Sequence, residues 1–247
     1  MIVLMLMEPV EIFPGAVIVR LGLYLKEYEA LVIGDLHIGF EDSLIQRGVL
    51  VPKFQERATL GLLKEIVERC PGHINQVILN GDVKHEFARI SSPEWSGALN
   101  VIDFLRSRVE KITIIKGNHD TIIGPIAKRH DIEVVKEVRL GRFLITHGDS
   151  IHSVAGVDCV IIGHEHPAIG LREGARVERY KCFLKGKFRS KTLIVMPSFL
   201  PATEGTDVIS SARLSPFLKG DISDFEVFVV EGKTYHFGKL SKVAALK

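Results

Sequence analysis

Five short apolar runs constrain the fold of this chain more than any other feature of its sequence. They cover residues 30–34, 76–80, 111–115, 142–146 and 157–162. Each run is rich in Val and Ile and is continuous rather than alternating, which is typical of strands buried on both faces. A chain with several such strands has to cover both faces of its sheet with other elements.

Every one of these runs is followed closely by aspartate, asparagine or histidine. The side chains concerned are Asp35, His37, Asp82, His85, Asn118, His119, Asp120, His147, His164 and His166. In open α/β sheets, ligands bind outside the carboxyl ends of the strands, so we expect these side chains at one edge. A lone histidine after a strand is an ordinary loop or core residue. If these residues shared no site, the ordinary interpretation would have to apply separately at all five strand ends. A shared site is the simpler explanation.

Helical periodicity separates some of the strands. The stretch "VPKFQERATLGLLKEIVERC" repeats apolar residues at helical spacing. In "SSPEWSGALNVIDFLRSRV", Ser92 is the expected N-cap and Pro93 the expected first helical residue. Strand patterns dominate from about residue 170 onward. This order predicts an α/β (α+β layered) fold in which the C-terminal half adds a second sheet.

Composition sets only broad limits on function. The net charge of +2 neither indicates a nucleic-acid binder nor excludes a local basic patch. Three cysteines without C-x-x-C spacing favour a reducing, cytoplasmic compartment. The N-terminus is apolar only through Met7 and predicts a first strand rather than a signal peptide. No apolar run reaches the roughly 18 residues that a membrane span requires.

The donor types at the strand ends favour divalent metal ions. Imidazole suits Zn, Fe and Mn, carboxylate oxygens suit harder ions, and the absence of thiolates argues against a structural zinc site. The donors are too many for one tetrahedral ion, whereas two ions sharing a carboxylate would use them all, as in phosphoester hydrolysis. A zincin motif fails because Ala168 stands where its second histidine would be. Nucleophile-elbow and phosphate-loop motifs are absent.

The order of the motifs resembles the calcineurin-like metallophosphoesterase superfamily. D-x-H, G-D, G-N-H-D, T-H-G and G-H-x-H follow one another between residues 32 and 167. The resemblance implies a four-layer αββα sandwich, with two mixed β-sheets flanked by helices and a dinuclear metal site at the C-terminal ends of strands. It also implies a single domain over residues 1–247, without a separate capping domain.

The resemblance further implies a metal-ligand set. The first ion would be held by Asp35, His37 and His166. The second would be held by Asn118, His147 and His164. Asp82 would bridge the two, and a hydroxide between the ions would attack phosphorus. We expect two divalent ions, Mn²⁺ first, with Fe, Ni, Co and Zn as alternatives.

Three more residues receive catalytic roles by the same resemblance. His119 would serve as general acid or electrostatic stabiliser near the leaving oxygen, and His85 would join it. Asp120 would orient the His119 ring by a hydrogen bond, the alternative being an acid at a helix N-terminus. Glu165, between the two histidines of "GHEHP", is expected to point away from the site because alternate residues of an extended chain face opposite sides.

The residues within the motifs suggest a subgroup of this superfamily. "GDVKH" and "KGNHD" lack the arginines of phosphoprotein phosphatases and look like DNA-end nucleases of the SbcD type. The chain length and "GHEHP" look closer to archaeal SbcD-related and bacterial ligase-associated DNA-damage-response phosphoesterases. The resemblance implies a phosphodiesterase or nuclease acting on DNA or nucleotide diesters, with a DNA-repair helicase or ligase as partner. The alternatives are a phosphomonoesterase, a nucleotide pyrophosphatase or a non-catalytic interaction module.

Basic and aromatic residues near the expected rim are candidates for contact with nucleic acid. The basic candidates for phosphate contact are Arg47, Lys53, Lys84, Arg89 and Lys116. Phe40 and Trp95 are candidates for base stacking, although core packing is the commoner role of such residues.

Overall fold

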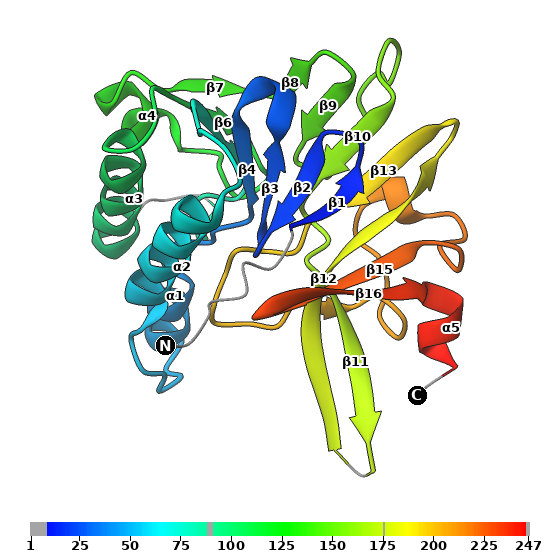
Figure 1. Ribbon diagram of the computed structural model, residues 1–247. Coiled ribbons are helices and arrows are strands. Elements are labelled where there is room, and N and C mark those ends of the chain that lie inside the picture. Colours follow the sequence, from blue (N-terminus) through cyan, green and yellow to red (C-terminus); the bar gives the residue numbers. More distant parts are fainter. Residues whose placement is uncertain (1–8, 88–90, 175, 246–247) are drawn as a thin grey trace, which may run out of the picture.

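Two mixed β-sheets pack face to face in the computed structural model, which describes residues 9–87, 91–174 and 176–245 (Figure 1). The first sheet has strand order β1-β2-β3-β4-β5-β6-β7. Its strands are β1 (Val10–Phe13), β2 (Ala16–Val19), β3 (Gly22–Leu25), β4 (Ala30–Gly34), β5 (Gln76–Asn80), β6 (Lys111–Ile115) and β7 (Glu133–Val135). The strands from β1 to β4 pair antiparallel and those from β4 to β7 pair parallel.

The second sheet is built by the C-terminal half, as predicted. Its order is β14-β11-β12-β13-β10-β9-β8, with β15 paired to β12 and β16 to β15. The strands are β8 (Glu137–Leu140), β9 (Phe143–Thr146), β10 (Cys159–Ile162), β11 (Pro167–Glu173), β12 (Arg176–Phe188), β13 (Lys191–Val195), β14 (Thr206–Asp207), β15 (Glu226–Glu231) and β16 (Lys233–Lys239). The β11–β12 hairpin projects beyond the rest of the molecule (Figure 1).

Helices cover the outer faces unequally. They are α1 (Phe40–Gln46), α2 (Gln55–Arg69), α3 (Ser92–Arg106), α4 (Gly124–Arg129) and α5 (Leu240–Ala244), with 3₁₀ turns η1 (Lys26–Tyr28) and η2 (Pro216–Leu218). The long helices α2 and α3 lie on the first sheet (Figure 1). The second sheet is covered by η2, α5 and loops, so its helical layer is thin.

Alternate residues of the central strands enter two different hydrophobic cores. Phe143, Ile145 and Ile161 lie in the core that the two sheets share. Leu144 and Val160, their neighbours along β9 and β10, lie in the core on the outer face of the second sheet. The two-sided burial explains why these strands read as continuous apolar runs.

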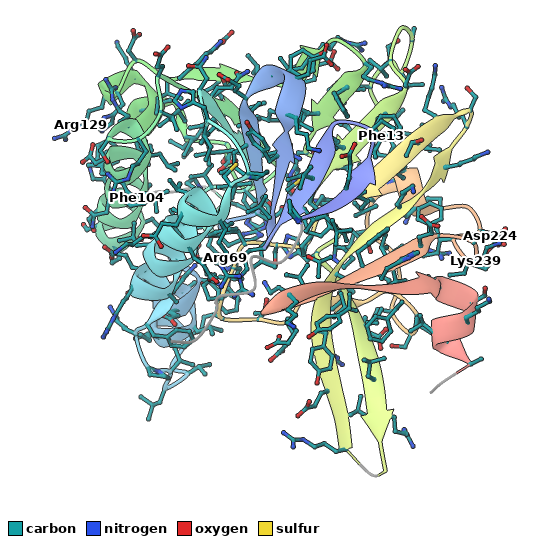
Figure 2. All side chains as sticks on the ribbon, in the orientation of Figure 1. Phe13, Arg69, Phe104, Arg129, Asp224 and Lys239 are labelled. Carbon is teal, nitrogen blue, oxygen red and sulfur yellow. The ribbon has the colours of Figure 1, made fainter. Side chains whose placement is uncertain are left out.

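An aromatic contact joins the two sheets near one edge. Phe13 lies on β1 at this edge (Figure 2). Its ring lies edge-on to Phe143 of β9, with 5.7 Å between ring centroids. Tyr28, at the end of η1, makes a second edge-on contact with Phe143 at 6.2 Å. Aromatic pairs prefer this geometry, which adds to the area that the rings bury.

The fold class and the second sheet are confirmed, with local corrections. The strands predicted at 142–146 and 157–162 begin later, at Phe143 and Cys159. The N-cap of α3 is Ser91 rather than Ser92, because Ser91 and Glu94 form a reciprocal capping box. The strand predicted within residues 1–7 lies outside the described residues. Assignment of residues 1–247 to a single catalytic domain stays a prediction.

Within the described residues, every helix falls short of the length and apolarity needed to cross a lipid bilayer.

Two glycines lie in opposite surroundings, one tightly packed and one open, and together they test the packing of the fold. A Cβ atom on Gly186 of β12 would lie 2.2 Å from the ring of Phe225, whereas one on Gly61 of α2 would meet nothing within 4 Å. Gly186→Ala should therefore lower the free energy of unfolding by about 1–3 kcal/mol through overpacking. Gly61→Ala should raise it by about 0.5–1 kcal/mol through helix propensity. Urea unfolding of both variants measures the pair, and equal stabilities would contradict the packing described.

Candidate metal centre

Loops from both sheets meet at one end of the sandwich and gather the predicted ligands. The strands β4, β5 and β6 of the first sheet and β9 and β10 of the second all end here. Potential ligand atoms fall into three groups, each within 4.8 Å: Asp35, His37 and His166; Asp82, His147 and His164; and His37, His85 and His119. The first two groups match the two ligand sets expected from the sequence, apart from Asn118.

The second predicted set closes around the Nε2 atom of His147. That nitrogen lies 3.0 Å from Asn118 Oδ1 and 3.1 Å from His164 Nδ1. It also lies 3.4 Å from Asp82 Oδ2. Asn118 therefore joins this group, and four donor atoms from four different loops converge on one small volume.

The first predicted set converges in the same way. His166 Nε2 lies 3.2 Å from Asp35 Oδ1 and 3.3 Å from His37 Nε2. His37 Nε2 in turn lies 3.6 Å from Asp82 Oδ2. The same Asp82 oxygen thus faces both groups, as a bridging carboxylate would.

These separations fit divalent ions. Ligands about 2.1 Å from an ion are separated by about 3.0–3.4 Å in octahedral or tetrahedral coordination. All but one of the six distances fall in that range. The donor set of carboxylate, amide and imidazole atoms also contains only groups that bind such ions in their unprotonated form. The residues present therefore fit two divalent ions that share Asp82.

The electrostatics of the site favour the ligand-competent forms of Asp82 and His37, but without an ion they favour the protonated ring of His147. Burial alone would raise the pKa of Asp82, but its hydrogen bond to His147 and the charges of His147 and His37 hold the pKa below its usual range. Burial and the neighbouring His166 lower the pKa of His37 to about 3, so its ring is neutral. Burial opposes the protonation of His147, yet its hydrogen bond with Asp82 and the charge of Asp35 raise its pKa to about 9.

The backbone adopts unusual conformations at these ligands. Nine described non-glycine residues have positive φ, and five of them are predicted ligands of this centre. They are Asp35, His37, Asp82, His164 and His166, with φ between 45° and 65°. Left-handed backbone at non-glycine residues is costly and concentrates at functional sites.

The prediction of an extended "GHEHP" segment is therefore wrong. His164 and His166 reach the site through left-handed turns, not through the alternation of an extended chain. Glu165 does point away from the centre. Its carboxylate is buried and accepts hydrogen bonds from the backbone N–H groups of Leu214 and Ser215, at 2.9 and 2.8 Å.

Two motif glycines allow the ligand loops to approach one another. A Cβ atom on Gly117 would lie 2.2 Å from Asp82 Oδ1. A Cβ atom on Gly163 would lie 2.4 Å from Asp35 Oδ2. The glycines of G-N-H-D and G-H-x-H are thus required by close packing between loops of different strands.

His119 and His85 stand beside the ligand groups with their rings stacked. Their ring centroids are 5.4 Å apart. His119 Nδ1 contacts the carbonyl oxygen of His85, while its Nε2 lies 4.0 Å from Asp82 Oδ2. The second nitrogen of His119 is therefore the one that faces the centre.

The expected role of Asp120 is wrong, because its carboxylate does not contact the His119 ring. Instead it accepts hydrogen bonds from the backbone N–H groups of Gly117, Val83 and Lys84, at 3.1 to 3.3 Å. Burial and the nearby Asp82 charge raise its pKa to about 6 despite these donors. Asp120 thus fastens the loop after β6 to the loop after β5, and the His85 carbonyl orients His119.

Some supporting residues were not predicted from the sequence. The buried Glu94 accepts hydrogen bonds from the backbone N–H groups of His85 and Glu86, at 3.2 and 2.7 Å, and so fixes the His85 loop to α3. Phe87 covers His119 with 3.7 Å between ring centroids and is 51% exposed. An aromatic residue two positions after His85 was the available sequence signal.

A half-buried lysine holds the segment that contacts the Asp35 backbone. Lys181 Nζ donates to the carbonyl oxygens of Ser198 and Leu200, at 2.8 and 2.6 Å. Between them, the backbone N–H of Phe199 donates to the carbonyl oxygen of Asp35 at 3.2 Å. Burial lowers the pKa of Lys181 to about 7. Nothing in the local sequence of β12 distinguishes this lysine from an exposed one.

The basic residues predicted at the rim differ in exposure and in ion pairing. Lys84 is fully buried and is excluded from contact with phosphate. Arg47 and Lys53 are exposed but pair with Glu86 and Asp42. Lys116 is exposed directly beside the centre. Arg89 lies outside the described residues.

The two aromatic residues predicted as candidates for base stacking pack against other parts of the protein. Phe40 packs edge-on against His85, with 5.1 Å between ring centroids. Trp95 packs against the main hydrophobic core. Both side chains are half-buried and have packing contacts of the ordinary kind.

The Glu165 geometry gives a test of the ligand assignment. Glu165→Gln should keep the metal content of wild type but lower the free energy of unfolding by about 1–2 kcal/mol, since an amide nitrogen would face a backbone donor. His166→Ala should lose bound metal, because it removes a donor. Elemental analysis after dialysis, together with urea unfolding, measures both. Equal metal loss in the two variants would contradict the assignment of His166 as a ligand and of Glu165 as a residue outside the centre.

Comparison with known proteins places the chain in a family. The sequence profile of the calcineurin-like phosphoesterase family matches residues 29–157. A nuclease MPE from Pseudomonas putida shares the fold, with a TM-score of 0.66 and 22% identity over 93% of this chain and 99% of that chain. A predicted phosphoesterase from Streptococcus pneumoniae aligns with a TM-score of 0.33 and 19% identity, over 85% and 97% of the two chains.

No curated protein sequence matches the chain. The expected SbcD-related subgroup stays a prediction. The superfamily resemblance is confirmed, since the profile covers the D-x-H, G-D, G-N-H-D and T-H-G motifs, whose ligands the structure brings together. The chain belongs to the calcineurin-like phosphoesterase family.

Proposed function

We propose that this protein is a metal-dependent phosphodiesterase of the nuclease type, acting on DNA or nucleotide diesters. The observation that carries the proposal is the fixed His119 ring beside a donor set for two ions. A phosphodiester has an alkoxide leaving group, and its departure is assisted by a proton donor. We expect His119 to supply that proton.

The tautomer of His119 follows from its contact with the His85 carbonyl. A carbonyl oxygen only accepts hydrogen bonds, so Nδ1 of His119 has to carry a proton. In the neutral ring Nε2 is then unprotonated, and in the protonated ring Nε2–H points towards the centre. His119 can therefore deliver a proton from Nε2 and be reprotonated there.

The ligand residues would hold two divalent ions. Asp35, His37 and His166 would hold one, Asn118, His147 and His164 the other, and Asp82 both. When bound, the ions supply an activated water and neutralise the charge on the phosphoryl oxygens. Mixed oxygen and imidazole donors without thiolate favour Mn²⁺, with Fe, Ni, Co and Zn as alternatives.

The exposure of the centre supports a diester rather than a monoester, whereas the stacked imidazoles His85 and His119 could protonate the leaving alkoxide of either ester. The side chains of His119 and His166 are 16% and 21% exposed, so the centre opens to the surface and a long substrate can lie across it. The Pseudomonas putida protein of similar fold is described as a nuclease. A DNA-repair helicase or ligase partner stays part of the proposal.

A substrate panel tests the proposed function. The full chain, loaded in turn with Mn²⁺, Fe²⁺, Ni²⁺, Co²⁺ and Zn²⁺, is assayed on bis-p-nitrophenyl phosphate, p-nitrophenyl phosphate and single- and double-stranded DNA. We expect the diesters to be cleaved faster than the monoester. A faster monoester reaction would favour a phosphomonoesterase, and inactivity with every metal would overturn the enzymatic proposal.

Two substitutions separate metal binding from proton transfer. His119→Ala should keep both ions and lower kcat on DNA by roughly 10²–10⁴, the usual contribution of a general acid. Asp82→Ala should lose bound metal because it removes the shared carboxylate. The exposed His73, which precedes β5 at the opposite end of the sheet, provides a matched control as His73→Ala. Unchanged turnover of His119→Ala, with metal content equal to wild type, would show that His119 is misassigned.

A further inference from the structure

Two lysines continue the row of functional residues along the edge of the first sheet. Lys116 and Lys136 each come directly after a strand, β6 and β7 respectively. These strands are parallel neighbours with Ile115 opposite Val135, and the backbone N–H of Lys116 donates to the Val135 carbonyl at 2.8 Å. Both lysines therefore lie at the same carboxyl edge as the metal centre.

A groove separates these lysines from the loop that follows β9. It has a volume of about 380 Å³. Lys116, Asn118, Thr121 and Lys136 line one wall, and residues 149–152 line the other. Because Asn118 belongs to both the groove and the ligand set, the groove opens directly from the centre.

The two lysine charges in this groove are not neutralised by ion pairs within the described residues. Neither Lys116 nor Lys136 forms an ion pair with a described carboxylate, whereas Lys26, Lys53 and Lys111 each pair with one.

The opposite wall is less charged. His152 there pairs with Glu137 at 2.8 Å, which leaves Asp149 as the one negative charge among the lining residues. The two lysines thus outweigh the acid, and the groove is cationic.

We propose that this groove binds the phosphate group adjacent to the scissile one in a nucleic-acid strand. The inference rests on the proposed function and names a substrate subsite for it. Neighbouring strands are about 4.8 Å apart, so β7 lies about 10 Å from β5, the strand that Asp82 follows. One nucleotide step and a lysine side chain together can span that distance. A substrate with a single phosphate would leave the lysines without a partner.

The subsite makes a long strand a better substrate than a small diester. Its contribution is to binding, because Lys116 and Lys136 contact a phosphate that does not react. Lysine contacts to phosphate also displace counterions, so that binding weakens with salt by a slope of about 0.7 for each phosphate of a single strand. Both properties can be measured independently of the chemistry at the centre.

The test compares Lys116→Ala/Lys136→Ala with wild type in the full chain. On a ten-nucleotide oligothymidylate we expect kcat/KM to fall by about 10- to 100-fold, mainly through KM, the scale of a lost charged hydrogen bond. On bis-p-nitrophenyl phosphate we expect no change beyond twofold. Fluorescence anisotropy with the labelled oligonucleotide should show a salt slope smaller by about 0.7.

Two control variants sharpen the comparison. Lys187 and Lys191 flank the β12–β13 turn, at the opposite end of the second sheet, and their double alanine variant should behave as wild type. Lys116→Arg/Lys136→Arg should retain the salt slope, since the charge is kept. Thermal melting confirms that all variants are folded.

The outcomes distinguish this inference from the proposed function. If wild type cleaves neither diester nor DNA, the proposed function fails, and the anisotropy measurement still decides whether the lysines bind the strand. If wild type is active but the lysine variant matches the Lys187/Lys191 control on the oligonucleotide, the subsite is disproved. An equal loss on the oligonucleotide and on bis-p-nitrophenyl phosphate would also overturn it, because the lysines would then act through the centre itself.

Discussion

The carboxylate of Asp82 is the point on which the functional end of this molecule depends. One of its oxygens lies 3.6 Å from His37, which follows a strand of the first sheet, and 3.4 Å from His147, which follows a strand of the second. The two sheets meet through polar contacts here and through apolar packing elsewhere. A buried carboxylate surrounded by imidazoles is stable only with hydrogen bonds or cations. Divalent ions at this point would therefore join the two sheets as well as serve catalysis.

The ligands were predictable from the sequence because each follows a strand that the sequence itself marks. Apolar runs fix where β4, β5, β6, β9 and β10 end, and parallel strands deliver whatever follows them to a common edge. Asp35, Asp82, Asn118 and the histidines were candidates from these strand ends alone, and the family resemblance divided them into two ligand sets. The confirmed fold class rests on the same runs, together with the change from helical to strand patterns near residue 170.

Other features could not be predicted because they depend on contacts between distant segments. Glu94 supports His85 from the first turn of α3, and Asp120 fastens one ligand loop to another instead of orienting His119. Lys136 follows the three-residue edge strand β7, whose pattern is too short to mark a strand end. A sequence pattern reports local periodicity and burial, and it does not report which backbone donor a buried carboxylate will meet.

The left-handed backbone at five ligands has a consequence for the protein without ions. Such a conformation costs about 1 kcal/mol or more at each non-glycine residue. The five together then amount to about 5 kcal/mol, comparable with the low end of a domain's net stability. Without bound ions, hydrogen bonds such as those accepted by Asp120, Glu94 and Glu165 hold these loops. Local opening should therefore begin at this edge while the strands stay paired. The backbone amides of the loops that carry the predicted ligands would then exchange hydrogen fastest.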